Sequence, residues 1–194
     1  MAGVTERAFI EELANPHSWL ITADNLHSQA IALHERTGRG LLTFIARDGQ
    51  RTTWDETNRA VFLLGGFALE NALKAFLVYE NPEWISNGRL SRKLRSHSLT
   101  TLQQQIKRVP FKKSLLWVLL EFEEGLESWA RYPCGLDASR SGHQTVLTEK
   151  SWDGYLRLMA AYGKRLRILL RREWRGPNGF HARWHIDTEF LARS

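Results

Sequence analysis

A histidine and an arginine five residues apart give this sequence its clearest chemical signal. Arg92 and His97 stand in the run RLSRKLRSH, and His97 is predicted to begin a helix with Ser96 as its N-cap. An arginine grips a phosphate through a fork of donors, and a histidine moves a proton near neutral pH. Together they supply what metal-free RNA cleavage needs, a base for the 2′-hydroxyl and a cation for the phosphate. The alternative is a histidine that only caps a helix.

Two charged residues interrupt the longest apolar segment of the chain. Glu70 and Lys74 are four residues apart in FLLGGFALENALKAFL, so they share one face of a helix and can pair. A buried carboxylate and a buried ammonium each cost several kcal/mol of desolvation, roughly, unless they are partnered. The pair is therefore either a structural ion pair or a group that orients and tunes the His97 site.

Arg131 and Tyr132 close a later helix in the sequence WARYP. An arginine at a helix C-terminus interacts favourably with the helix dipole. This structural role alone would account for Arg131. The functional interpretation places both residues beside Glu70, Lys74 and His97, in one polar site at the end of a bundle. In that case Arg92 or Arg131 contacts the phosphate.

Basic residues are concentrated in two stretches of a chain whose net charge is +6. Residues 150–194 hold ten Lys/Arg against four Asp/Glu, and residues 89–113 hold eight Lys/Arg and no acid. Such stretches predict a polyanion partner, with RNA the leading candidate, although they are also typical of solvated helix faces. The predicted nucleic-acid contacts are Arg89, Lys93, Arg95, Arg171, Arg172 and Arg175.

The remaining patterns point away from metal and cofactor chemistry. His181 and His185 are four apart, but no group of acids supports a metal site there, and we expect no cofactor. His27 and His34 are predicted to be partly exposed helix residues rather than ligands. The single cysteine, Cys134, excludes an internal disulfide and a cysteine-based zinc site. No phosphate-binding loop, dinucleotide fingerprint or nucleophile elbow is present.

Periodicity and punctuation predict an all-α fold, an up-and-down bundle of four to five main helices. The central helix is expected from Trp54, with Thr53 as N-cap, to Asn81-Pro82, buried on nearly every side. Gly65 and Gly66 within it indicate close approach of a neighbouring helix. Residues 41–45 could be a strand or a helical turn. The other expected helices cover 5–13, 16–37, 97–108, 111–131 and 149–174, with Gly38 ending the second and a polar loop over roughly 133–148.

The expected organisation is a single helical bundle domain over 1–175 and a basic, aromatic C-terminal tail over 176–194. That tail has room for one more short helix. No apolar run is long enough to cross a membrane before Glu70 interrupts it, and Glu6, Glu11 and Glu12 disrupt any signal peptide pattern. With one cysteine, these features predict a cytoplasmic protein.

Three motifs taken together resemble the HEPN-domain family. FLLGGFALENALKAFL is similar to its Gly-aromatic-small-Leu-Glu-x-x-Leu-Lys helix, HSLTTL to its His-x-Leu-x-x-Leu helix start, and WARYP to an Arg-Tyr-Pro motif found in some members. The order of the motifs also agrees, and the resemblance spans about residues 54–174.

This resemblance implies a helical bundle, often dimeric, in prokaryotic immunity, toxin–antitoxin or nucleotidyltransferase-linked systems. Active members are metal-independent ribonucleases that use an Arg-x4-6-His motif. Here Arg131 has no histidine four to six residues on, whereas Arg92 and His97 fit the spacing but lie earlier in the chain. The expectation is an RNA-binding effector with ribonuclease activity; the alternative is a non-catalytic module that docks a partner protein such as a nucleotidyltransferase.

Overall fold

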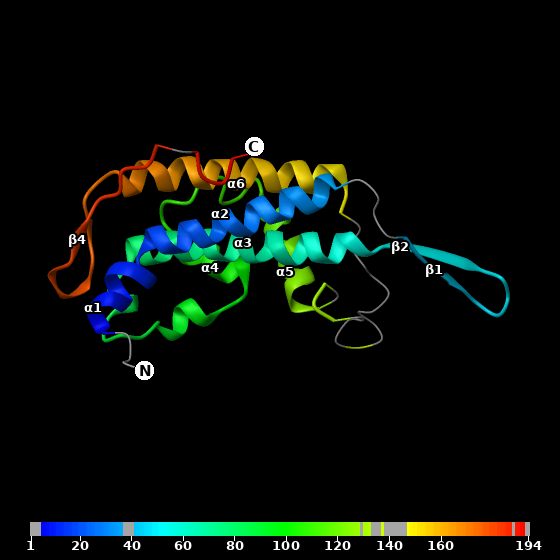
Figure 1. Ribbon diagram of the computed structural model, residues 1–194, viewed down its shortest axis with the longest axis horizontal. Coiled ribbons are helices and arrows are strands. Elements are labelled where there is room, and N and C mark those ends of the chain that lie inside the picture. The colour runs from blue at the N-terminus through cyan, green and yellow to red at the C-terminus, as the bar shows by residue number, and fades with distance from the viewer. Residues whose placement is uncertain are drawn as a thin grey trace.

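Three long helices lie side by side along the length of the protein (Figure 1). The computed structural model describes residues 5–36, 41–128, 130–132, 137, 147–187 and 189–192, the side chains of 41–42 and 54–58 excepted. This part of the chain is mostly helical, which confirms the all-α class. The three long helices are α2 (Pro16–Glu35), α3 (Glu56–Glu80) and α6 (Glu149–Leu170).

The central helix is α3, which contacts α2, α6 and the two shorter helices α4 (Leu99–Gln105) and α5 (Leu116–Glu127). It is the one described helix long and apolar enough to cross a membrane, yet 78% of its apolar window is buried inside the protein. Its glycines do allow close packing, because a Cβ on Gly65 would lie 2.6 Å from Phe122 and one on Gly66 would lie 2.7 Å from Leu126. A buried apolar helix of this kind is typical of the core of a soluble protein.

The start of α3 differs from the sequence-based expectation. Residues 41–45 are a strand, β1 (Leu41–Ile45), which pairs antiparallel with β2 (Arg51–Asp55) in a hairpin that projects from one end of the bundle (Figure 1). Thr53 is therefore not an N-cap: its hydroxyl lies 3.2 Å from that of Thr43 on the facing strand. The β-branched and aromatic residues of 51–54 favour a strand over the first turn of a helix.

The two shorter helices also begin later than predicted. The N-cap of α4 is Ser98 and not Ser96, because the Ser98 hydroxyl accepts from the backbone N–H of Thr101 at 3.2 Å. Residues 110–115 form turns, so α5 begins at Leu116, and Phe111 has a positive φ of 54°. Before α4 the basic stretch contains two 3-10 helices, η2 (Pro82–Ile85) and η3 (Arg92–Arg95).

The N-terminal segments agree more closely with the sequence. Thr5 caps α1 (Glu6–Ala8), which continues as a π-helical turn, η1 (Phe9–Leu13). Pro16 is the first residue of α2, as predicted, and Asn15 caps that helix. The predicted end at Gly38 and most of the predicted 133–148 loop lie outside the described residues.

The C-terminal segment forms a small hairpin, which contains the short 3-10 helix η4 (Pro177–Gly179), and then an extended strap, here residues 184–187 and 189–191. Helix α6 ends at Leu170, so Trp174 belongs to β3 (Trp174–Arg175), which pairs with β4 (His181–Ala182). The residues that follow return along the bundle, where Leu191 donates its backbone N–H to Asp24 at 2.7 Å. Ile186 and Leu191 are buried, so the tail contributes to the core.

Candidate functional site

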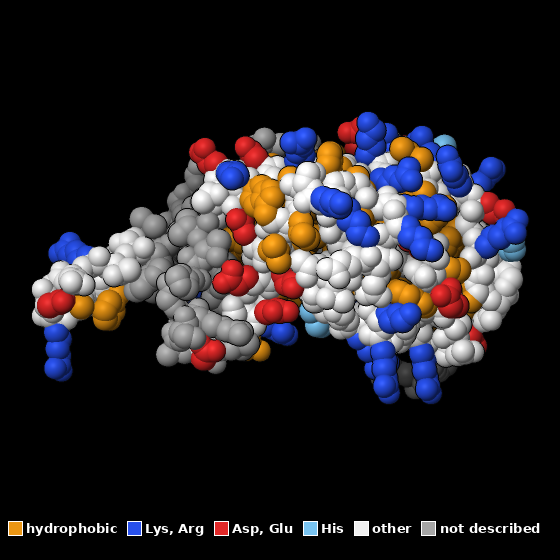
Figure 2. Space-filling view, turned by 180° about the vertical axis from the view of Figure 1, so that it is seen from behind, with side chains coloured by type: hydrophobic (Ala, Val, Ile, Leu, Met, Phe, Trp, Pro, Cys, Tyr) orange, Lys and Arg blue, Asp and Glu red, His pale blue; other side chains and the backbone are white. Residues whose placement is uncertain are grey.

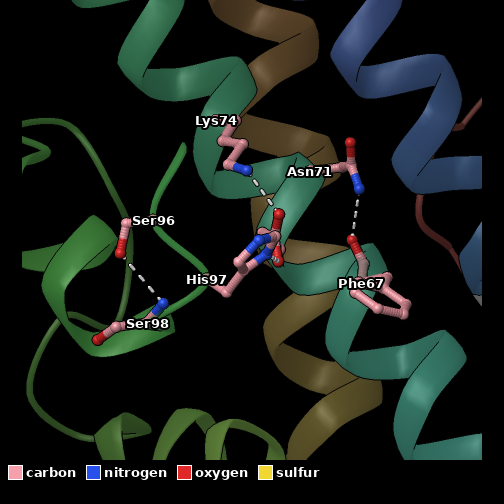
Figure 3. A network of polar contacts seen from close by, with 7 residues as sticks. Phe67, Asn71, Lys74, Ser96, His97 and Ser98 are labelled. Carbon is pink, nitrogen blue, oxygen red and sulfur yellow. Dashed lines mark hydrogen bonds and ion pairs between the residues drawn. The ribbon is translucent and has the colours of Figure 1, made fainter. Parts of the chain in front are cut away.

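A buried carboxylate on α3 contacts an ammonium of the same helix and an imidazole from the segment before α4 (Figure 3). Lys74 Nζ lies 2.5 Å from Glu70 Oε1, and His97 Nδ1 lies 3.0 Å from Glu70 Oε2. The side chains of Glu70 and Lys74 are each 6% exposed, whereas that of His97 is 61% exposed. The cluster therefore has a buried charged base and a tip that reaches solvent.

Burial of the charged pair is explained by its partners. The carboxylate uses one oxygen for Lys74 and the other for His97, so neither oxygen is left without a partner. Trp19 of α2 covers the ammonium, with Lys74 Nζ 5.5 Å from its ring centroid, a cation–π contact. The i, i+4 pairing that the sequence predicts is confirmed.

The segment that carries His97 is held by a second carboxylate, on α5. Glu123 accepts from the backbone N–H of Thr100 at 2.7 Å and from the Ser98 hydroxyl at 3.1 Å. These bonds satisfy donors at the start of α4 and fix the residues directly after His97. Ser96 adds a local bond, since its hydroxyl accepts from the Ser98 N–H at 3.2 Å (Figure 3).

No hydrogen bond or ion pair among the described residues joins the predicted arginines to this cluster. Arg92 is exposed on η3, which ends just before the residues that carry His97. Arg131 lies 5.9 Å over the ring of its neighbour Tyr132, whose carbonyl accepts from Arg59 at 3.2 Å. Arg59 precedes Glu70 by eleven residues on α3, about 16 Å along the axis. The expectation of one site that contains Arg131 and Tyr132 is therefore not met.

The six predicted nucleic-acid contacts are all exposed, although several have partners. Lys93 Nζ lies 4.8 Å over the Trp84 ring, and Arg95 donates to the Leu90 carbonyl at 3.5 Å. Arg171 donates to the Ile186 carbonyl at 2.6 Å, so it helps to hold the C-terminal strap. The exposed side chains are those of Arg89, Lys93, Arg95, Arg171, Arg172 and Arg175.

The other histidines that the structure describes contact neighbouring side chains. The prediction that His27 is partly exposed is wrong: it is 1% exposed, and its Nδ1 lies 2.9 Å from the Tyr155 hydroxyl. Burial lowers the pKa of His27. His181 contacts Glu173 at 3.0 Å, and His185 contacts Asp187 at 2.9 Å. Among the residues described here, no three His, Cys, Asp or Glu side chains are grouped so that they could hold a metal ion.

Chemically, the cluster can present one imidazole nitrogen to a substrate. Because Glu70 accepts a hydrogen bond from Nδ1, Nε2 of His97 is the nitrogen that can exchange a proton with a bound molecule. Sequence reasoning found Glu70, Lys74 and His97. It missed Trp19 and Glu123, whose roles depend on helix contacts between residues far apart in the chain.

Comparison of the chain with protein-family models, with curated proteins and with solved structures finds no match in any of the three.

Proposed function

We propose that this protein is a HEPN-like RNA-binding effector that cleaves RNA without a metal, with His97 as the acid/base. The observation that carries the proposal is the contact of Glu70 with His97 Nδ1 at 3.0 Å, which orients an imidazole that is 61% exposed. A carboxylate that fixes the tautomer and orientation of a histidine is a recurring arrangement in acid–base catalysis. The arrangement of the motifs in the sequence supports the same conclusion.

In this mechanism His97 Nε2 takes the proton of a ribose 2′-hydroxyl, and the resulting oxygen attacks the adjacent phosphorus. The bond from phosphorus to the 5′-oxygen breaks, and the products are a 2′,3′-cyclic phosphate and a 5′-hydroxyl. The 3-10 helix η3 ends just before the residues that carry His97, so its cations, Arg92, Lys93 and Arg95, are the nearest in sequence for the phosphate. A second copy in a homodimer would contribute a second His97 as the acid.

The setting that we propose is a cytoplasmic toxin or defence system, as the family resemblance implies. A second candidate function, a non-catalytic module that docks a partner protein such as a nucleotidyltransferase, is favoured by one observation. Among the described residues, neither Arg92 nor Arg131 forms a hydrogen bond with the cluster of Glu70, Lys74 and His97. In that case Glu70 and Lys74 form a structural pair, and His97 has no substrate.

The test is cleavage of single-stranded RNA by the purified protein in excess EDTA, with His97→Ala and His181→Ala as a matched pair. His181 is also exposed and also contacts a carboxylate, so it controls for loss of a surface histidine. We expect cyclic phosphate ends with the wild type and His181→Ala, and no cleavage with His97→Ala. Equal cleavage by all three would exclude His97, and no cleavage by any would favour the docking module.

A further inference from the structure

Four basic residues stand at intervals of seven along α6 and the residue that follows it: Lys150, Arg157, Lys164 and Arg171. Seven residues are close to two helical turns, so these side chains form one line, with steps of about 10 Å. Lys150, Arg157 and Lys164 are exposed. Figure 2 shows Lys and Arg side chains gathered, with apolar side chains between them, toward the end away from the β1–β2 hairpin.

Two aromatic rings lie beside this line of cations. Lys150 Nζ is 5.3 Å over the ring of Trp117, and the guanidinium of Arg157 is 5.2 Å over the ring of Phe111. Phe111 is 39% exposed, and its φ of 54° is a backbone conformation that bulky residues rarely adopt. Core packing does not explain a strained backbone that holds an aromatic ring at the surface, so the ring itself is a candidate for ligand contact.

Phe111 lies in the turn between α4 and α5, residues 106–115, which carries four cations: Lys107, Arg108, Lys112 and Lys113. Glu80 accepts from the backbone N–H groups of Lys107 and Arg108, both at 2.9 Å, so its carboxylate binds the backbone of the turn. Lys112 is also used internally, since its ammonium donates to the carbonyls of Gln104 and Ile106. The guanidinium of Arg108 lies 5.8 Å over the ring of Tyr79, so the exposed cations of the turn that no contact between described residues engages are those of Lys107 and Lys113.

We propose that the α6 surface, defined by Lys107, Phe111, Lys113, Arg157 and Lys164, binds single-stranded RNA. Cations that track a phosphate backbone beside an exposed ring are what single-stranded nucleic acid requires, because each unpaired base has a face that can stack. A duplex would hide those faces from Phe111. One acid, Asp153, stands one turn before Arg157 on α6.

The surface connects to the candidate active site through α4. His97 lies just before this seven-residue helix and Lys107 just after it, a separation of about 10 to 15 Å. The exposed residues of α4 are polar and uncharged: Thr101, Gln104 and Gln105. A single-stranded RNA bound on the α6 surface can thus extend along α4 to His97. The inference deepens the proposed function, because it assigns the place where the substrate of His97 binds.

Binding is measured by fluorescence anisotropy with a short 2′-O-methyl RNA, which the proposed mechanism cannot cleave. Phe111→Gly removes the ring and suits the positive φ, so we expect affinity to fall about tenfold or more while the melting temperature stays equal or rises. The triple variant Lys107→Ala, Arg157→Ala, Lys164→Ala is expected to reduce the slope of log affinity against log salt by about 2. The control Arg47→Ala, Arg51→Ala removes two exposed cations from the β1–β2 hairpin and should leave binding unchanged.

Three results would overturn the inference: unchanged affinity in Phe111→Gly, an equal loss in the control, or equal binding of duplex RNA or phosphatidylserine vesicles with the same dependence on the triple variant. Cleavage of ordinary RNA is recorded separately. Binding through the α6 surface with no cleavage would refute the ribonuclease alone, and cleavage with no effect of these variants would refute the surface alone.

Discussion

The backbone carbonyl of Phe190 packs directly against Gly163, at the place where any other residue would carry its Cβ. Because the obstructing atom belongs to the backbone, it cannot rotate away. Gly163→Ala should therefore displace the C-terminal strap or strain α6, and we expect it to reduce the free energy of unfolding by about 1–3 kcal/mol. Urea denaturation measures the loss, and limited proteolysis shows whether the strap has become accessible.

The matched control is Gly125→Ala in α5. A Cβ there would meet Phe62 at 3.4 Å and Ala130 at 3.5 Å, which are ordinary contacts. Alanine is favoured over glycine within a helix by about 1 kcal/mol, so this variant should be neutral or more stable. Equal destabilisation by the two variants would show that the Phe190 contact does not hold the strap.

Removal of Lys74 leaves the buried carboxylate of Glu70 without its nearest cation. Lys74→Met should reduce the free energy of unfolding by about 3–5 kcal/mol, as expected when one member of a buried ion pair is lost. The double variant Glu70→Gln, Lys74→Met removes both charges and should recover most of that loss. A loss below about 1 kcal/mol for Lys74→Met in urea denaturation would mean that water reaches Glu70 and that the pair is not a structural requirement.

Glu123 is expected to position His97 from a distance. Glu123→Ala leaves the N–H of Thr100 and the hydroxyl of Ser98 without their acceptor, which should destabilise the protein by about 1–3 kcal/mol. The exposed neighbour Glu124 serves as control, and Glu124→Ala should remain within about 0.5 kcal/mol of the wild type. Amide hydrogen exchange at residues 98–101 should become faster in the first variant only. Unchanged exchange there would refute the anchoring role.

The stability of the protein should depend on pH through His27. Burial lowers the pKa of this imidazole below its ordinary value of 6.5, although the charge of Asp24 opposes the effect. On acidification the unfolded chain binds a proton near pH 6.5 before the folded protein does, so the free energy of unfolding decreases as the pH falls below about 7. The slope from this one group reaches at most about 1.4 kcal/mol per pH unit.

Denaturation curves between pH 7.5 and 5.5 would measure this dependence. His27→Gln should flatten it, whereas His181→Gln, at an exposed histidine, should retain it. The pKa of His17 is also lowered by burial, so a residual slope of the same sign is expected in His27→Gln. A slope unchanged by His27→Gln would assign the pH dependence to other groups.

The sequence predicted those parts of the fold that depend on local pattern. The apolar length of α3, the proline that begins α2 and the pairing of Glu70 with Lys74 all follow from spacing along one helix. The sequence placed His97 and Glu70 in one polar site, but it did not predict the direct contact between them. That this contact serves RNA cleavage is a prediction.

The sequence could not predict contacts between residues that are far apart in the chain. Glu123 and Ser98 are twenty-five residues apart, and nothing in their local patterns indicates that one holds the other. His27 looked like a helix-surface residue because its burial comes from Tyr155 of α6. Trp174 is a different case, because its partner is local: it continues the periodicity of α6 but pairs as a strand with Ala182, eight residues further on.

The strap has a consequence for how the protein is made. The strap residues 184–187 and 189–191 cover parts of α2 and α6: Trp184 stacks on His17, Leu191 donates its backbone N–H to Asp24, and the Phe190 carbonyl packs against Gly163. A chain emerging from the ribosome exposes α2 early, yet the residues that cover it arrive last. Until then the apolar surfaces under Ile186 and Leu191 are exposed to water. A polypeptide released before residue 184 would therefore keep an exposed apolar surface that chaperones and proteases recognise.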